Sequence, residues 1–200
     1  MRIHTNEEAT LCIERSSFIA YLLPCEQEET FTQAYQNLKK LHRDADHFCY
    51  GIVLENTTRN SDDGEPGGTA GLPILQSLLR RNIDNAAIVV VRYFGGIKLG
   101  KGGLFRAYSA AAEAVLKKAP LFECYEVIDY EISLPYELAH RFRYHLENHH
   151  LPFRVDYDEQ VMFHFSLLPE ANLQPLLELT KGQVPQRVGC SFHERQINHV

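Results

Sequence analysis

The segment Arg92–Arg106, RYFGGIKLGKGGLFR, combines cations with glycines in a pattern typical of anion binding. Its cations are Arg92, Lys98, Lys101 and Arg106, and it contains no acidic residue. Gly95, Gly100 and Lys101 have the G-x-x-x-x-G-K spacing of a phosphate-binding P-loop. A P-loop continues with Ser or Thr, whose hydroxyl binds Mg²⁺, but Gly102 stands at that position. The pattern therefore predicts an anion-receptive turn without the ATPase chemistry of a P-loop.

The same segment is expected to lead from an apolar strand into a helix. Cations at a helix start are unfavourable by ~0.3–1 kcal/mol each unless an anion compensates, and glycines let a backbone approach that anion. The predicted anion- or nucleic-acid-binding residues are Arg92, Gly95, Gly96, Lys98, Gly100, Lys101, Gly103 and Arg106. Aromatic residues between the cations suit stacked bases, although Phe94 and Tyr108 suit a core equally well.

An acidic turn precedes this segment in the chain. Its candidate functional residues are Asp62, Asp63, Gly64 and Glu65. These carboxylates can pair with Arg92 or Lys98 inside the protein, or they can act as Mg²⁺ ligands or a general base. The two alternatives stay open. Because a full coordination set is not evident in the sequence, we expect no metal and no cofactor.

Histidines and cysteines offer other chemistry. His47 and Cys49 lie two residues apart on an expected strand, so a Cys–His nucleophile competes with simple burial of the thiol. His145, His149 and His150 suit the solvated end of a helix, where the dipole favours them. No residue is assigned a catalytic role.

Composition limits the class of protein. The 200 residues are 44% hydrophobic and carry a net charge of −6. Lys+Arg balance Asp+Glu, 14 to 14, over residues 1–122, whereas residues 123–200 have 6 against 12. A wholly basic nucleic-acid binder is excluded, but a local basic patch is not. Five scattered cysteines without a C-x-x-C pair, no signal pattern and no apolar run of about 20 residues predict a soluble cytoplasmic protein without membrane contact.

Periodicity predicts two α+β domains. Residues 1–120 should form β-β-α-β-α-β-α, with strands in 9–24, 48–55 and 86–91 and helices at 30–41, 71–81 and 104–118. Residues 121–200 should form the ferredoxin-like order β-α-β-β-α-β. Its strands are expected at 125–134, 153–157, 161–167 and 186–193, and its helices at 135–148 and 170–180.

Three motifs carry a family resemblance: SDDGEPGGTAG at 61–71, VVVRYFGGIKLGKGGLFRAY at 89–108, and the H-x-x-A-x-H-x-C pattern at 42–49. Together they resemble the IMPACT family in its bacterial YigZ-like branch. The resemblance implies a first domain like the second domain of ribosomal protein S5, and a second domain like the last domain of elongation factor G. It also implies a role in translation, as in eukaryotic members, and a functional surface formed by the acidic turn together with Arg92 and the glycines Gly95, Gly96, Gly100 and Gly103.

We therefore expect a binding or regulatory protein rather than an enzyme. It would contact RNA or ribosomes through the glycine-rich segment, and its acidic second domain would contact a protein partner. The alternative is an enzyme, such as a metal-dependent hydrolase, that acts on a phosphorylated or peptide substrate through residues 61–65. A third hypothesis is an adaptor that docks an acidic protein on the same basic surface.

Overall fold

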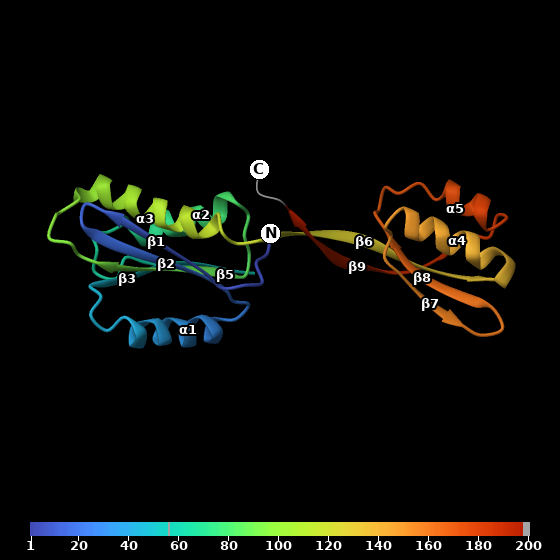
Figure 1. Ribbon diagram of the computed structural model, residues 1–200, viewed down its shortest axis with the longest axis horizontal. Helices are drawn as coiled ribbons and strands as arrows, with labels where there is room; N and C mark the ends of the chain where they lie inside the picture. The colour runs from blue at the N-terminus through green and yellow to red at the C-terminus, as the bar shows by residue number, and fades with distance from the viewer. Residues whose placement is uncertain (56, 198–200) are drawn as a thin grey trace. The chain divides into compact units, whose positions relative to one another are not determined.

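The structure is a computed structural model that describes residues 1–55 and 57–197 (Figure 1). It is a mixed α/β protein with two sheets and divides into two compact units. The first unit comprises Met1–Glu123 and the C-terminal residues from Arg195, and the second comprises Cys124–Glu194. The chain thus passes between the units within two of its strands.

The first unit is built on a five-stranded sheet with the order β1-β2-β5-β3-β4, in which every neighbouring pair is antiparallel. Its elements are β1 (Glu7–Ile13), β2 (Ser16–Pro24), α1 (Glu28–Leu41), β3 (His47–Leu54), β4 (Thr57–Ser61), α2 (Gly71–Arg80), β5 (Ala86–Tyr93) and α3 (Gly100–Leu116).

Helices cover both faces of this sheet. Figure 1 shows α1 on one face and α2 and α3 together on the opposite face. The continuous apolar sequence of β5 suits this position, because Ala86–Val91 are all fully buried. Side chains of alternate β5 residues enter the two cores: Ile88 and Val90 pack with α2 and α3, and Val89 and Val91 pack with α1.

The sequence prediction for this unit was wrong in two places. It omitted β4, so the order is β-β-α-β-β-α-β-α. It also began the third helix at Leu104, whereas α3 begins at Gly100. Gly100, Lys101 and Gly103 are therefore residues of a helical turn, and the connection between β5 and α3 is shorter than expected.

A tight hairpin joins β1 to β2 beside this connection. Glu14 and Arg15 both have positive φ, 45° and 64°, as a two-residue turn that follows the sheet twist requires. The carbonyl of Arg15 lies so close to Gly95 that a Cβ there would be 2.0 Å from the Arg15 oxygen. Gly95 is thus required by the contact of two backbones within the chain.

The second unit has the predicted ferredoxin-like order. Its elements are β6 (Leu121–Leu134), α4 (Tyr136–Asn148), β7 (Phe153–Tyr157), β8 (Val161–Leu167), α5 (Gln174–Leu179) and β9 (Gln186–Ile197). The sheet order is β7-β8-β6-β9, so the central strands are the first and third of the motif. Both helices lie on one face of the sheet (Figure 1), where Phe142 of α4 contacts Phe163 and Phe165. The second helix is shorter than the predicted 170–180, and the last strand extends beyond 193.

Candidate anion-binding site

Arg92, at the end of β5, is buried with 4% of its surface exposed. Its Nη1 donates to Oε1 of Glu65 at 2.5 Å, and its Nη2 donates to Oγ of Ser16 at 3.4 Å. The hydroxyl of Tyr108 donates to the same Glu65 oxygen at 2.7 Å. A buried charge needs such partners, and Glu65 supplies one within the chain. Of the internal pairings left open by the sequence, the structure forms Arg92–Glu65.

The carboxylate of Asp62 organises the acidic turn and the start of α2. It accepts hydrogen bonds from the backbone N–H groups of Gly68, Ala70 and Gly71 at 2.8–2.9 Å. Partial burial disfavours the charged form, but these N–H groups outweigh it and lower the pKa of the Asp62 carboxyl. Asp62 therefore acts as a cap for backbone donors that would otherwise lack partners.

Asp63 and Gly64 complete the turn against β3. Oδ2 of Asp63 accepts a hydrogen bond from the backbone N–H of Phe48 at 2.7 Å, and its carbonyl lies 2.8 Å from Nδ1 of His47. Gly64 has φ +87°, in the left-handed region. With Glu65 bound to Arg92, all three carboxylates of residues 61–65 have partners within the protein.

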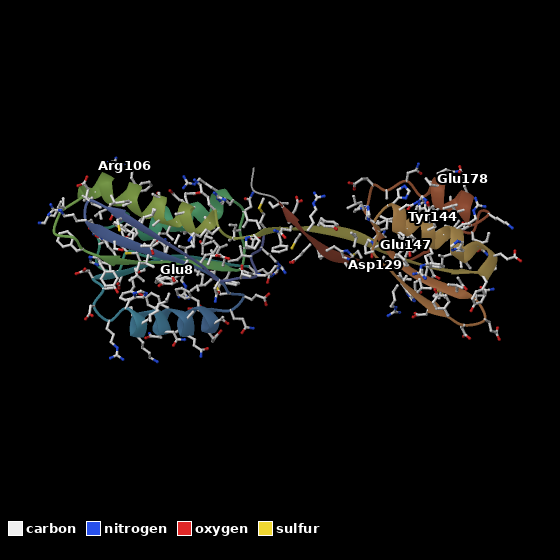
Figure 2. The ribbon with its side chains drawn as sticks, viewed as in Figure 1. Glu8, Arg106, Asp129, Tyr144, Glu147 and Glu178 are labelled. Carbon is white, nitrogen blue, oxygen red and sulfur yellow. The ribbon has the colours of Figure 1, made fainter. Side chains whose placement is uncertain are left out.

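Three cations remain at the surface. Lys98, Lys101 and Arg106 are exposed, and none has an ion pair with any residue of 1–55 or 57–197. The apolar side chains beside them are also partly exposed, at 45% for Phe94, 37% for Ile97 and 38% for Phe105. We call these six residues the β5–α3 surface; Arg106 is labelled on α3 in Figure 2.

The glycines of this segment have different positions. Gly96 lies in the connection, and Gly100 begins α3 with φ +68°. Gly103 lies in the first turn of α3, where a Cβ would be 2.9 Å from Cβ of Leu99. The packing and backbone conformation of the chain itself account for these glycines, so they are not in themselves evidence for a bound anion.

A cavity of about 480 Å³ lies between the acidic turn and the β5–α3 surface. Its lining residues are Asp46, His47, Glu65, Pro66, Arg92, Phe94, Lys98, Leu99, Gly100, Lys101 and Leu104. The fold thus brings Arg92, Lys98, Lys101 and Glu65 into one site. Arg106, Asp62 and Asp63 do not line it.

Sequence reasoning missed one lining residue with a clear role. Oδ2 of Asp46 accepts a hydrogen bond from the backbone N–H of Phe94 at 2.7 Å, which holds the start of the connection against β3. Asp46 directly precedes His47 and lies inside the H-x-x-A-x-H-x-C pattern at 42–49, but it is not one of the residues that define the pattern. A carboxylate just before a strand could have been recognised as a loop cap.

Cys49 does not form a nucleophile–base pair. Its Sγ lies 3.0 Å from the carbonyl oxygen of Asp62 and 3.4 Å from the Tyr108 hydroxyl, and burial raises the pKa of its thiol to about 12. Nδ1 of His47, the other residue of the predicted pair, lies 2.8 Å from the carbonyl oxygen of Asp63, and His42 lies between the hydroxyls of Tyr21 and Tyr93. The reactive form of a cysteine is the thiolate, which this burial suppresses.

The histidines of α4 lie at its C-terminal end, as the sequence indicated. The rings of His145 and His149 are 4.1 Å apart, and burial and the neighbouring His149 lower the pKa of His145. Within the part of the chain that the structure describes, no three His, Cys, Asp or Glu side chains are grouped so as to hold a metal ion. In the same part, no helix is long and apolar enough to cross a membrane.

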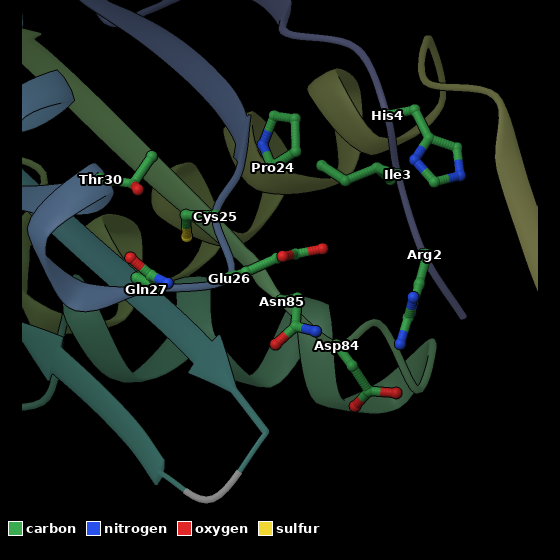
Figure 3. Close-up of a pocket in the computed structure, with 10 residues that line it drawn as sticks. All are labelled: Arg2, Ile3, His4, Pro24, Cys25, Glu26, Gln27, Thr30, Asp84 and Asn85. Carbon is green, nitrogen blue, oxygen red and sulfur yellow. The ribbon is translucent and has the colours of Figure 1, made fainter.

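A second cavity of the first unit, about 330 Å³, is shown in Figure 3. Its lining carries one cation, Arg2, against two carboxylates, Glu26 and Asp84, so it does not favour an anion. Thr30, from the first turn of α1, and Cys25, whose pKa burial raises to about 11, also line it. Of the cationic residues predicted from the sequence, Arg92, Lys98 and Lys101 line the other cavity.

Comparison with known proteins bears on the first unit most directly. Residues 14–116 match the Impact N-terminal domain family, which covers half of the chain. This chain belongs to the IMPACT family. The resemblance indicated by the three motifs is confirmed, and the matched range contains the whole cavity and the β5–α3 surface.

Relatives and one solved structure extend the match. The IMPACT family member YvyE of Bacillus subtilis is 33% identical over 201 residues, covering 96% of this chain and 93% of the relative. The family member YigZ of Escherichia coli is 37% identical over 122 residues, which cover 56% of this chain and 60% of the YigZ chain. A crystal structure described as a hypothetical protein is similar with a TM-score of 0.57 at 26% identity, covering 99% of this chain and 97% of the other. The two-unit architecture is therefore shared with a solved structure.

Proposed function

We propose that this IMPACT-family protein regulates translation by contacting RNA, free or within ribosomes, through the β5–α3 surface. One observation carries the proposal. Lys98, Lys101 and Arg106 are exposed around the start of α3, and the described residues supply no acidic partner to any of them. The charge of Arg92, in contrast, is already compensated by Glu65.

The helix start itself favours an external anion. The first turn of α3 has no acidic residue, and among the residues that the structure describes no side chain caps the helix start. Its positive end therefore adds to the charge of Lys101 and Arg106. A polyanion with several phosphates would compensate the positive charge of all three cations.

Exposed aromatic residues favour RNA over an acidic protein. Phe94 and Phe105 lie on the β5–α3 surface beside the cations. Unstacked bases bind to such rings, while Lys and Arg contact phosphates without reading the sequence. Membership of the IMPACT family supports the proposed role in translation, because the resemblance implies such a role.

The second unit would have a different partner. Residues 124–194 carry 11 acidic and 5 basic residues, a charge that repels RNA. A protein contact therefore suits this unit better. The engagement of Asp62, Asp63 and Glu65 within the fold supports binding rather than metal-dependent catalysis by the acidic turn.

Sedimentation with ribosomes through sucrose tests the proposal. The wild-type protein should co-sediment at low salt and dissociate as salt rises, because phosphate contacts release counterions. The variant Lys98→Glu/Lys101→Glu should remain at the top of the gradient. Lys40→Glu/Lys117→Glu is the matched control, since it makes the same charge change at exposed positions elsewhere in the first unit. Wild-type protein that stays at the top even at low salt would contradict a ribosomal partner.

A further inference from the structure

The cavity of about 480 Å³ combines two kinds of polar group. Lys98, Lys101 and the start of α3 supply positive charge, whereas Asp46 and Glu65 supply carboxylate oxygens. Its volume falls within the range of about 300–1,000 Å³ that is usual for small-molecule sites. A ligand that complements the whole lining must offer an anionic group in one part and hydrogen-bond donors in another.

An aromatic ring and a buried cation belong to the same lining. Phe94 is nearly half exposed, and its ring centre lies 5.4 Å from the guanidinium carbon of Arg92. A half-exposed ring beside a cation is a surface on which a nucleobase stacks.

Arg92 also has a donor left over. Its Nε is buried and has no hydrogen-bond partner anywhere in the described ranges 1–55 and 57–197. Buried polar groups are normally paired, so Arg92, which lines the cavity, retains one donor that the described residues leave without an acceptor. This observation distinguishes the cavity from an ordinary basic helix start.

We infer that the cavity binds a single nucleoside monophosphate unit, with its phosphate at Lys98, Lys101 and the first N–H groups of α3 and its base against Phe94. The inference deepens the proposed function and rests on it, because the unit would be an unstacked nucleotide of an RNA strand or a free nucleotide. Ribose hydroxyls and base amino groups supply the donors that Asp46 and Glu65 can accept. Inorganic phosphate would contact only the cationic part of the lining, whereas a nucleoside would contact only Phe94 and the carboxylates.

Titration of the full chain with AMP, followed by ¹H–¹⁵N NMR, tests the inference. AMP should produce saturable shifts in the amides of residues 46–47, 65 and 92–104. Adenosine and inorganic phosphate, titrated separately, should each bind at least about tenfold more weakly, because each lacks one half of the contacts. Equal binding of AMP and inorganic phosphate would overturn the inference, as would an AMP titration without saturable shifts at millimolar concentration.

Two pairs of variants localise the ligand. Phe94→Ala should weaken AMP binding at least about tenfold through loss of stacking. Phe192→Ala removes an exposed ring outside the lining and outside the β5–α3 surface, and this variant should bind as the wild type does. Lys98→Glu/Lys101→Glu should abolish the shifts, and Lys40→Glu/Lys117→Glu should retain them. Urea midpoints of all four variants establish that each is folded, and wild-type affinity in Lys98→Glu/Lys101→Glu would place the nucleotide elsewhere.

A short oligoadenylate distinguishes the two sources of the nucleotide. If the oligomer binds more tightly than AMP and causes the same shifts, the natural ligand is an RNA strand. If it binds equally or more weakly, the natural ligand is a free nucleotide. Ribosome co-sedimentation without AMP binding would overturn this inference and leave the proposed function standing. AMP binding at the cavity without any RNA or ribosome association would support the nucleotide site and contradict the proposed function.

Discussion

Arg92 and Glu65 form a buried ion pair that joins the central strand β5 to the acidic turn, with Nη1 and Oε1 2.5 Å apart. The side chains of both residues are no more than 5% exposed. Two motifs that are separated in sequence and together indicate the family are therefore parts of one structural unit. The pair also lines the cavity, so the folding of the turn determines the shape of the candidate site.

Glu65→Gln should lower the free energy of unfolding by about 3–5 kcal/mol, because it leaves the charge of Arg92 buried without a counterion. Urea denaturation measures the effect. Glu28→Gln, which breaks the exposed pair with Arg59, should cost less than about 1 kcal/mol. The double variant Glu65→Met/Arg92→Met should be more stable than Glu65→Gln; if it is less stable, the ion pair is not the source of the loss.

Asp62→Asn should cost about 1–2 kcal/mol at neutral pH, through weaker capping of the backbone donors at the start of α2. Folding lowers the pKa of the Asp62 carboxyl, so its contribution is complete above the unfolded value of about 3.9. The contribution is lost as the pH falls from there through the lowered native pKa. Urea denaturation between neutral and acid pH should show wild type and Asp62→Asn converging in stability as the pH falls.

The exposed Asp44 provides the comparison for this acid dependence. Asp44→Asn should follow the wild-type curve at every pH, because no described residue pairs with its carboxylate. Parallel curves for wild type and Asp62→Asn down to strongly acid pH would show that the charge of Asp62 does not stabilise the fold.

Apolar periodicity sufficed to predict most of the elements of this fold. The buried strand β5 and the helices α1, α2 and α4 have clear apolar patterns, and their apolar residues are among the buried residues of the hydrophobic cores. β4 was missed because Thr57–Ser61 is entirely polar and mostly exposed at a sheet edge, so alternation is absent. The start of α3 was missed because glycines disfavour helices. In the structure Leu104 is in the core and Leu99 packs against it, which favours a helix that begins at Gly100.

The candidate site was harder to predict than the fold. The sequence does not distinguish the environment of Arg92 from that of Lys98, although the former is buried and the latter exposed. Burial of Arg92 follows from its place at the end of an apolar central strand, which a count of charges does not reveal. Asp46 enters the site only because β3 pairs with β5, a long-range contact without a local signal.

Cys49 should be inert towards alkylation in the native protein. At a pKa of about 12, roughly one thiol in ten thousand is ionised near pH 8. Iodoacetamide labelling followed by peptide mass spectrometry should modify the exposed Cys12 and Cys190 and leave Cys49 until urea unfolds the chain. Labelling of native Cys49 at the rate of Cys12 would restore the possibility of a reactive thiol.

Gly95→Ala should destabilise the first unit by at least about 1–3 kcal/mol, because the added Cβ meets the carbonyl of Arg15 and the hairpin or the connection must move. Gly67→Ala is the matched control, since a Cβ there meets no atom within 4 Å. Urea midpoints compare the two variants. A Gly95→Ala protein as stable as the wild type would mean that the hairpin and the β5–α3 connection separate readily.

The most direct test of the role proposed for the β5–α3 surface is the salt dependence of its affinity for a fluorescently labelled single-stranded RNA, measured by anisotropy. Each phosphate contact contributes about −0.7 to the slope of log K against log salt concentration. The variant Lys98→Glu/Lys101→Glu/Arg106→Glu should bind weakly, with a slope about 2 units shallower than that of the wild type. Equal affinities and equal slopes for the two proteins would contradict the account and place any RNA contact on another face of the molecule.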